Sequence, residues 1–168
     1  MNTEINRYYL EIHSAQEINE LKTLLPEYKI SNIAPPNFEL NKFFYKNIGK
    51  KHQWTDRLIW SDTQWIDYVE NEKVDTFILK RNEDMAGYFE LIHHKSANEI
   101  EIAYLGLLDD YLNKKIGSFL LYSALKKSFL KNPKRVWVHT CSLDHKNALN
   151  NYLSRGMKVF KEETLFLN

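Results

Sequence analysis

Hydrophobic and polar residues recur along the chain with two different periods. Apolar residues at every second position predict strands, and apolar residues at every third or fourth position predict helices. Strands are therefore expected at residues 8–13, 74–80, 85–93, 98–108, 134–141 and 157–166. Helices are expected at residues 17–25, 38–48, 61–70, 116–130 and 144–155. This order predicts an α/β fold with antiparallel strands early and a parallel crossover late.

Short local signals support several of these elements. Ser61 and Gln64 have the spacing of a capping box, in which each side chain satisfies a free amide group at a helix start. Asp144 is expected to cap the last helix, and Gly156 is expected to end it. The polar residues 81–84 lie between two apolar runs, so they predict a hairpin.

Composition narrows the class of protein. The 168 residues are 43% hydrophobic, enough for one ordinary folded domain. The formal net charge of +1 argues against a surface built for nucleic acid or anionic membrane, and no DNA-reading motif is visible. Cys141 is the one cysteine, so no intramolecular disulfide can form. No apolar run reaches the roughly 18 residues of a membrane helix, so we expect a soluble, cytoplasmic protein.

A basic turn precedes the helix predicted at residues 116–130. Lys114 and Lys115 add positive charge, while Gly117 and Ser118 keep side chains small at the helix start. Because free amide groups and the helix dipole favour anions there, this turn is a candidate phosphate site. The alternative is that the lysines only solvate a loop. The Gly-rich nucleotide and dinucleotide motifs are absent, which argues against nucleotide hydrolysis and hydride transfer.

Three segments resemble the GCN5-related N-acetyltransferases, the GNAT family. The family's pyrophosphate loop, Gln/Arg-x-x-Gly-x-Gly/Ala, corresponds to Leu112, Lys115 and Gly117, so the later part of the pattern is kept. Residues 101–107 resemble the family's fourth strand. Residues 147–157 resemble its Asn-x-x-Ala-x-x-x-Tyr-x-x-x-Gly-Phe segment, with the alanine one position early and methionine in place of phenylalanine.

The resemblance implies a mixed, mostly antiparallel twisted sheet flanked by helices, with a splay between the fourth and fifth strands. It implies one domain, in which residues 1–73 form the acceptor side and residues 74–168 the acetyl-CoA-binding core. Acetyl-CoA is the implied co-substrate, and no metal is implied. The residues expected to contact the coenzyme are Leu105, Leu107, Leu112, Asn113, Lys114, Lys115, Ile116, Gly117, Ser118 and Asn147.

The implied reaction moves an acetyl group to a primary amine of a small molecule or peptide. Tyr152 matches the family's tyrosine and is the candidate acid for the departing thiolate, although its spacing alone also fits a packing residue. Glu101 is the leading candidate base, and Glu99 lies on the same strand face. A backbone amide near Gly106 is the candidate donor to the carbonyl oxygen.

Other residues suggest weaker hypotheses. His139, Cys141 and His145 cluster in sequence, but no second Cys/His pair completes a zinc site. Five aromatic residues in the front half either pack the core or line an acceptor pocket, where Asp56 would pair with an ammonium. These are Phe43, Phe44, Tyr45, Trp54 and Trp60. A catalytically silent acyl-CoA-binding or interaction module is the competing interpretation, and a homodimer stays open.

Overall fold

One mixed sheet runs through the centre of the molecule. The computed structural model describes residues 3–112 and 115–167, and seven strands within these ranges form the sheet in the order β2-β3-β4-β5-β6-β1-β7. The strands are β1 (Thr3–Ile12), β2 (Tyr28–Asn32), β3 (Val74–Arg81), β4 (Asp84–His94), β5 (Glu99–Leu107), β6 (Arg135–Cys141) and β7 (Lys158–Leu167). β5 and β6 run parallel, and the other neighbouring strands described are antiparallel. The expected mixed, mostly antiparallel sheet is confirmed.

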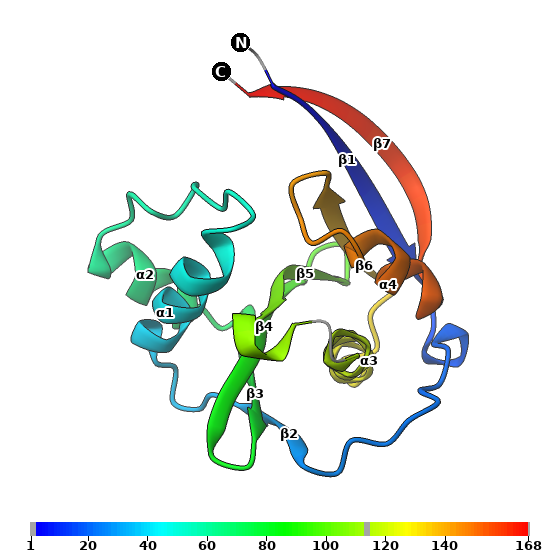
Figure 1. Ribbon diagram of the computed structural model, residues 1–168, viewed down its shortest axis with the longest axis horizontal. Helices are drawn as coiled ribbons and strands as arrows, with labels where there is room; N and C mark the ends of the chain where they lie inside the picture. Colours follow the sequence, from blue (N-terminus) through cyan, green and yellow to red (C-terminus); the bar gives the residue numbers. More distant parts are fainter. Residues whose placement is uncertain (1–2, 113–114, 168) are drawn as a thin grey trace.

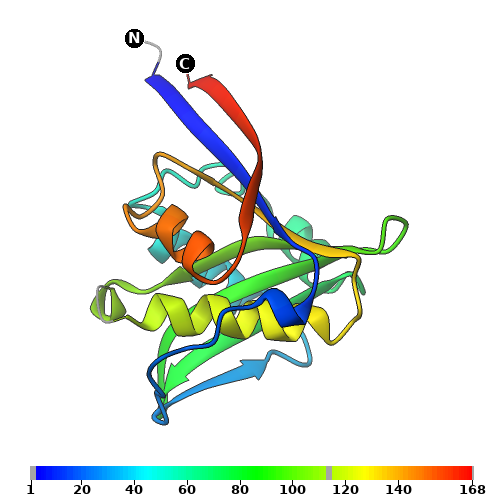
Figure 2. The same cartoon turned by 90° about the vertical axis from the view of Figure 1, so that its right-hand side faces the viewer.

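Helices cover both faces of this sheet (Figures 1 and 2). α1 (Phe38–Gly49) and α2 (Asp62–Val69) lie on one face, and α3 (Ile116–Phe129) and α4 (Ala148–Ser154) lie on the other. Successive side chains of a strand point to opposite faces. β4 therefore contributes Tyr88 to a small core under α1 and Phe89 to the larger core under α3.

Local sequence signals predict several elements correctly. The capping box of α2 is present: the Gln64 amide donates to Ser61 Oγ at 3.2 Å, and the Ser61 amide donates to Gln64 Oε1 at 2.9 Å. β3 and β4 form the expected hairpin, with Asn82 in the left-handed region at φ 53°. α3 begins at Ile116, the residue predicted from the apolar pattern.

The helix predicted at residues 17–25 is wrong. A single 3-10 turn, Ala15–Glu17, forms there, and the Leu24 side chain is exposed. The Asn19 amide donates to the Arg155 carbonyl at 3.0 Å, and the Arg155 guanidinium donates to the carbonyl oxygens of Asn19 and Glu20 at 2.9 and 3.0 Å. These backbone groups bond to a distant part of the chain, so they are not available for a local helix.

β5 and β6 are paired at one end and separate at the other. Their register runs from Glu99 opposite Arg135 to Glu101 opposite Trp137, and it ends there. Beyond Glu101, no strand in the described ranges pairs with this edge of β5, although β4 pairs with the other edge as far as Leu107. The fourth and fifth predicted strands, residues 98–108 and 134–141, correspond to β5 and β6. The expected splay between them is confirmed.

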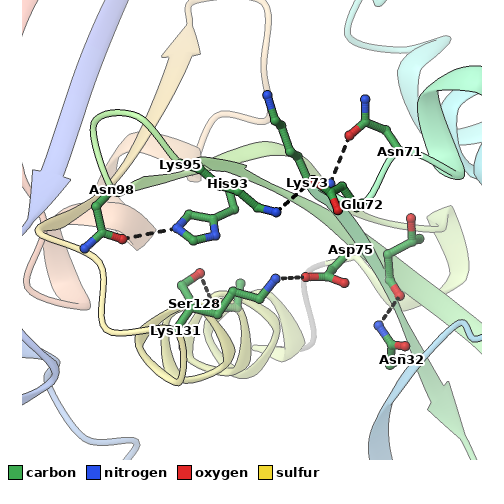
Figure 3. Close-up of polar contacts among 12 residues, drawn as sticks. Asn32, Asn71, Glu72, Lys73, Asp75, His93, Lys95, Asn98, Ser128 and Lys131 are labelled. Atoms are coloured by element: carbon green, nitrogen blue, oxygen red, sulfur yellow. Dashed lines mark hydrogen bonds and ion pairs between the residues drawn. The ribbon is translucent and has the colours of Figure 1, made fainter.

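Polar contacts hold the closed end of the splay (Figure 3). The Lys134 amide donates to the Asn98 carbonyl at 2.7 Å, and His93 Nε2 lies 3.1 Å from Asn98 Oδ1. Lys131, just after α3, forms an ion pair with Asp75 of β3. The Lys134–Asn98 bond joins the starts of β5 and β6, where the two strands are paired, and the strands diverge toward the N-terminal end of α3.

The two terminal strands form a ribbon that extends past the rest of the sheet (Figure 1). β1 pairs with β7 from Thr3 to Glu11 but with β6 only from Arg7 to Ile12, so its first residues pair with β7 alone. Through this pairing, Arg7 lies beside the open end of β6.

Candidate active site

A cavity of about 880 Å³ opens where β5 and β6 separate. Its walls come from the loop after α1, the diverging strands, the loop after β6, and the N-terminal end of α3 together with α4. Helices on both faces of the sheet therefore contribute to one site, as expected for a splayed sheet with a ligand between its strands.

The N-terminal end of α3 faces this cavity. Lys115, Gly117 and Ser118 line it, and among the described residues no side chain caps the first turn of the helix. Lys115 has φ 62°, a left-handed conformation that ends the preceding loop and starts the helix. Free amide groups of this 14-residue helix are thus available to an anion, and the helix dipole favours negative charge there.

Space is left beside Gly117. A Cβ there would meet nothing closer than Asn151 Nδ2 at 3.6 Å and Leu107 Cδ1 at 4.0 Å, so packing does not require glycine. The Asn151 amide group donates to the Gly117 carbonyl at 3.0 Å and fixes α4 against the start of α3. The missing side chain leaves space beside the start of α3, and the phosphate site stays a prediction.

The remaining predicted coenzyme contacts divide into three groups. Leu105, Leu107 and Leu112 line the cavity. Ile116 does not, because its side chain is buried in the core under α3. The last group, Asn113 and Lys114, lies outside the described residues.

The backbone of β5 is accessible from the cavity. The edge of β5 that faces the splay has no partner strand beyond Glu101 in the described ranges, so its amide and carbonyl groups are open to a ligand. Gly106 lets α1 approach this strand closely, since a Cβ there would lie 2.6 Å from Ile48 Cγ2. An extended ligand arm can therefore pair with β5 in the place that β6 has left.

Tyr152 points into the same cavity from α4. Its side chain is nearly buried, with 7% of the residue exposed, and its hydroxyl forms no hydrogen bond with any described residue. Burial, and then the negative charge of Asp144, raise the pKa of Tyr152 above its ordinary value. The hydroxyl therefore keeps its proton at neutral pH and can donate it.

The start of α4 differs from the prediction. The helix begins at Ala148 with Asn147 as its N-cap, and Asp144 does not cap it. Asp144 instead accepts hydrogen bonds from the Thr140 hydroxyl and the Cys141 amide, so it closes the turn after β6. Asn147 is exposed and lines the cavity, as its predicted role requires.

Glu101 also lines the cavity, on the sheet face that carries α1 and α2. One of its carboxylate oxygens lies 2.9 Å from His94 Nε2, and its side chain is 17% exposed. The His94 ring stacks on Trp137, with ring centres 6.0 Å apart. The predicted carboxylate is thus present at the site, but it is already held by a neighbouring side chain.

The aromatic residues of the front half have two different positions. Phe44 and Tyr45 are fully buried, whereas Trp54 lines the cavity and packs against Tyr104 at 4.8 Å between ring centres. Asp56 lines the cavity as well. Phe44 and Tyr45 therefore pack the core, Trp54 lines the cavity, and the acceptor pocket stays a prediction.

A buried ion pair next to the cavity was missed by the sequence analysis. Arg57 Nη1 donates to both oxygens of the fully buried Glu90, at 3.2 and 3.0 Å. The Tyr68 hydroxyl and the Asn41 amide group also donate to Glu90, at 2.8 and 2.9 Å. Glu90 is the acidic residue within the apolar run of β4. Because a buried charge requires a partner, this residue could have predicted a buried ion pair from the sequence.

Aromatic rings surround Arg57 on several sides. Its guanidinium carbon lies 4.1 Å from the ring centre of Tyr68, 4.3 Å from that of Tyr104 and 4.8 Å from that of Trp60. Burial is the largest single effect and alone would lower the pKa of Arg57, but the Glu90 carboxylate and the surrounding tyrosines together outweigh it and raise the pKa above its ordinary value. The charged side chain anchors the loop that carries Trp54 and Asp56.

The described parts of the chain contain neither a cluster of potential metal ligands nor a membrane-spanning helix. His139, Cys141 and His145 all line the cavity, yet no group of three or more potential metal ligands converges among residues 3–112 and 115–167. Within the same residues, no helix has the length and hydrophobicity to cross a membrane.

Comparison with solved structures shows the same fold in acetyltransferases. A GCN5-related N-acetyltransferase from Sphaerobacter thermophilus superposes with a TM-score of 0.72 at 12% identity, covering 96% of this chain and 50% of the other. The ribosomal-protein-S18-alanine N-acetyltransferase from Escherichia coli gives 0.59 at 16% identity, covering 77% and 76%. An aminoglycoside acetyltransferase from an uncultured soil sample gives 0.63 at 14% identity, covering 77% and 88%.

This chain is shorter than some of the structures that it resembles. The chain spans 62% of a functionally unknown conserved protein from Staphylococcus epidermidis, with a TM-score of 0.64 and 13% identity. A search of curated proteins found no match. The model of the acetyltransferase (GNAT) family matches residues 32–157, which include both diverging strands, α3 and α4. The chain therefore belongs to the GNAT family of acetyltransferases.

Proposed function

We propose that this protein transfers an acetyl group from acetyl-CoA to a primary amine of a small molecule or peptide. The observation that carries the proposal is the convergence of three features on one cavity: the uncapped start of α3, the open edge of β5 and the Tyr152 hydroxyl. They match the needs of a diphosphate, an extended pantetheine arm and a departing thiolate. Residues 74–168 then hold the donor, while residues 1–73 supply the acceptor side.

The chain's own groups have distinct tasks in this reaction. The amide groups at Gly117 and Ser118 bind phosphate oxygens, and Lys115 adds positive charge. A backbone amide of β5 near Gly106 donates to the carbonyl oxygen as negative charge develops on it. Tyr152 gives its proton to the sulfur as the C–S bond breaks. Glu101 lies on the acceptor face of the same cavity, where a carboxylate attracts an ammonium group.

The names of two structural relatives support an amine as the acceptor. One acts on aminoglycosides and the other on the alanine of a ribosomal protein, which are a polyamine sugar and a peptide amine. Trp54 and Tyr104 add an aromatic wall to the cavity, so an aromatic amine such as tyramine is a third probe.

Acetyl-CoA binding is tested by thermal unfolding. A ligand that binds only the folded state adds about 2.7 kcal/mol of stability at 100 times its Kd, so acetyl-CoA should raise Tm. Lys115→Glu should reduce the affinity for acetyl-CoA, because the new carboxylate repels phosphate. Lys22→Glu is the matched control, since Lys22 is exposed and does not line the cavity. Equal affinities in the two variants would place the phosphates elsewhere.

The acceptor wall is tested by truncation of Trp54. In Trp54→Ala we expect the KM for tyramine to rise by about tenfold or more, since a buried aromatic contact contributes about 1.5 kcal/mol or more. The KM for acetyl-CoA should change little. Phe43→Ala is the control, because Phe43 is partly exposed and does not line the cavity. An unchanged order of preference among tyramine, kanamycin and an N-terminal alanyl peptide would mean that the acceptor binds elsewhere.

Thiol release separates transfer from simple binding. A catalytically silent acyl-CoA-binding module would show the rise in Tm without release of coenzyme A thiol in the presence of any of these amines. The departure of Leu112 and Lys115 from the family's loop is the feature that favours this second function.

A further inference from the structure

His139 lies just beyond the point where β6 leaves β5. It is on the side of the cavity that faces α1 and α2, which is the proposed acceptor side. The last paired residues of the two strands are Glu101 and Trp137, and His139 follows two positions later. Val136 and Val138 are buried in the core under α3, so strand alternation directs His139 to the opposite face, the face of Glu101. Its side chain is exposed to the cavity and forms part of the wall.

The imidazole of His139 is free to accept a proton. Neither ring nitrogen bonds to any described residue, and the ring packs against Tyr9 with centres 5.6 Å apart. By contrast, Glu101 is held at 2.9 Å by His94. Of the two groups, His139 is the one with an unoccupied proton acceptor.

In the other two histidines that line the cavity, a ring nitrogen contacts a backbone group of another residue. His52 Nδ1 lies 3.2 Å from the Leu143 carbonyl, and both residues line the cavity. His145 Nδ1 accepts a hydrogen bond from the Asn147 amide at 3.1 Å. His139 is therefore the cavity histidine with both nitrogens available, as far as residues 3–112 and 115–167 are concerned.

Charged groups from four segments face His139. The walls of the cavity remove part of the ring's hydration, and this desolvation, followed by the charge of Arg7 on β1, lowers the pKa of His139. Glu101 on β5, Asp144 in the loop after β6 and Glu163 on β7 act in the opposite direction and do not outweigh these effects. A lowered pKa means that the imidazole is neutral at pH 7 and can accept a proton.

We propose that His139 is the general base that takes a proton from the acceptor ammonium; this assignment rests on the proposed function. The ammonium gives one proton to an imidazole nitrogen, and the neutral amine then attacks the thioester carbonyl carbon. A C–N bond forms and the C–S bond breaks. The sulfur takes the Tyr152 proton, and the second amine proton restores Tyr152 through solvent. The imidazolium finally releases its proton to water. Glu101, paired with His94, serves to attract the cation.

Substitution of His139 tests the assignment with tyramine, kanamycin and an N-terminal alanyl peptide as acceptors. In His139→Gln we expect kcat/KM at pH 7 to fall by about 10²–10⁴-fold, the usual contribution of a general base. In the wild type, kcat/KM should fall as pH drops through the pKa of His139, and this acidic limb should be lost in the variant. Added imidazole should partly restore His139→Ala.

Two further measurements keep the outcomes separate. The rise in Tm with acetyl-CoA should be the same in His139→Gln as in the wild type, and His13→Gln, outside the cavity, serves as the matched control. Transfer at the wild-type rate in His139→Gln, with the acidic limb intact, would overturn the assignment and leave the proposed function standing. Acetyl-CoA binding without transfer by the wild-type protein would overturn both.

The state of the ring can also be measured without an acceptor. Diethyl pyrocarbonate modifies neutral, accessible imidazoles, so mass spectrometry should find His139 modified faster at pH 7 than His52 or His145. Slow modification of His139 at that pH would show that the ring is either charged or covered, and it would overturn the proposal.

Discussion

Arg57→Ala should lower the free energy of unfolding by about 3–5 kcal/mol, because removal of one partner leaves the other charge buried and unpaired. Glu90 is fully buried, and Arg57 Nη1 contacts both of its oxygens. The expected loss is a large part of the roughly 5–15 kcal/mol that stabilises a folded domain. Urea denaturation followed by far-UV circular dichroism measures it.

The control variant for this experiment is Arg81→Ala. Arg81 is exposed at the end of β3 and forms no ion pair with a described residue, so its loss should change stability by about 0.5 kcal/mol or less. A loss below about 1 kcal/mol in Arg57→Ala would place the Arg57 pair in the class of surface ion pairs and contradict the expectation. Glu90→Gln should also destabilise the protein strongly, since it leaves the guanidinium without its counter-charge.

Arg57 should affect the binding of the acceptor amine as well as the stability of the fold. Arg57 positions the loop that carries Trp54 and Asp56, both of which line the cavity. In Arg57→Lys, which keeps a positive charge beside Glu90, we expect a higher KM for the amine and an unchanged Kd for acetyl-CoA. Lysine cannot reproduce the planar contacts with Tyr68 and Tyr104.

Tyr152→Phe should reduce kcat for thiol release by about 10²–10⁴-fold, the usual contribution of a general acid, with little change in acetyl-CoA affinity. The Tyr152 hydroxyl faces the cavity and has no hydrogen-bond partner among the described residues, so its removal should leave the fold intact. Tyr122→Phe is the matched control. The Tyr122 hydroxyl donates to Glu20 on the surface, away from the cavity.

The rate of thiol release should not depend on the ionisation of Tyr152 near neutral pH. Burial raises the pKa of Tyr152, and an acid acts only below its pKa. Between about pH 6 and 9, Tyr152 should therefore stay protonated and add no limb to the rate profile, since even an unperturbed tyrosine has a pKa of about 10. In the proposed mechanism the acidic limb belongs to His139, and it should lie below the ordinary histidine pKa of 6.5, because burial and Arg7 lower the pKa of His139. A full rate of thiol release in Tyr152→Phe would mean that water, not Tyr152, protonates the sulfur.

Where local interactions decide the conformation, the sequence predictions agree with the structure. The apolar stripe of α3 and the capping box of α2 involve residues within a few positions of each other, and both elements form as expected. The structure brings together four residues that the resemblance named, because the order of strand, loop and helix places them at one cavity: Lys115, Gly117, Asn147 and Tyr152.

Where distant parts of the chain compete, the predictions were wrong. Residues 17–25 have helical spacing, but Arg155 bonds to the backbone there. Asp144 has the character of an N-cap, but Thr140 and the Cys141 amide use its carboxylate. The edge strand β2 was not predicted, although it pairs with β3 from Tyr28 to Asn32. For residues 17–25 and for β2 a tertiary contact outweighs a weak local preference, whereas the Asp144 carboxylate is used by local hydrogen bonds within the turn after β6.

The sequence by itself therefore determined the α/β class, most of the helices and strands, and a group of residues that line one cavity, because these depend on local periodicity and on short motifs. Only the tertiary structure decided that Arg57 pairs with Glu90, that His94 holds Glu101, and that the His139 ring remains free at the open end of β6. Those relations join residues far apart in the chain, and a charge or an imidazole acquires its chemical role from the groups that surround it in space.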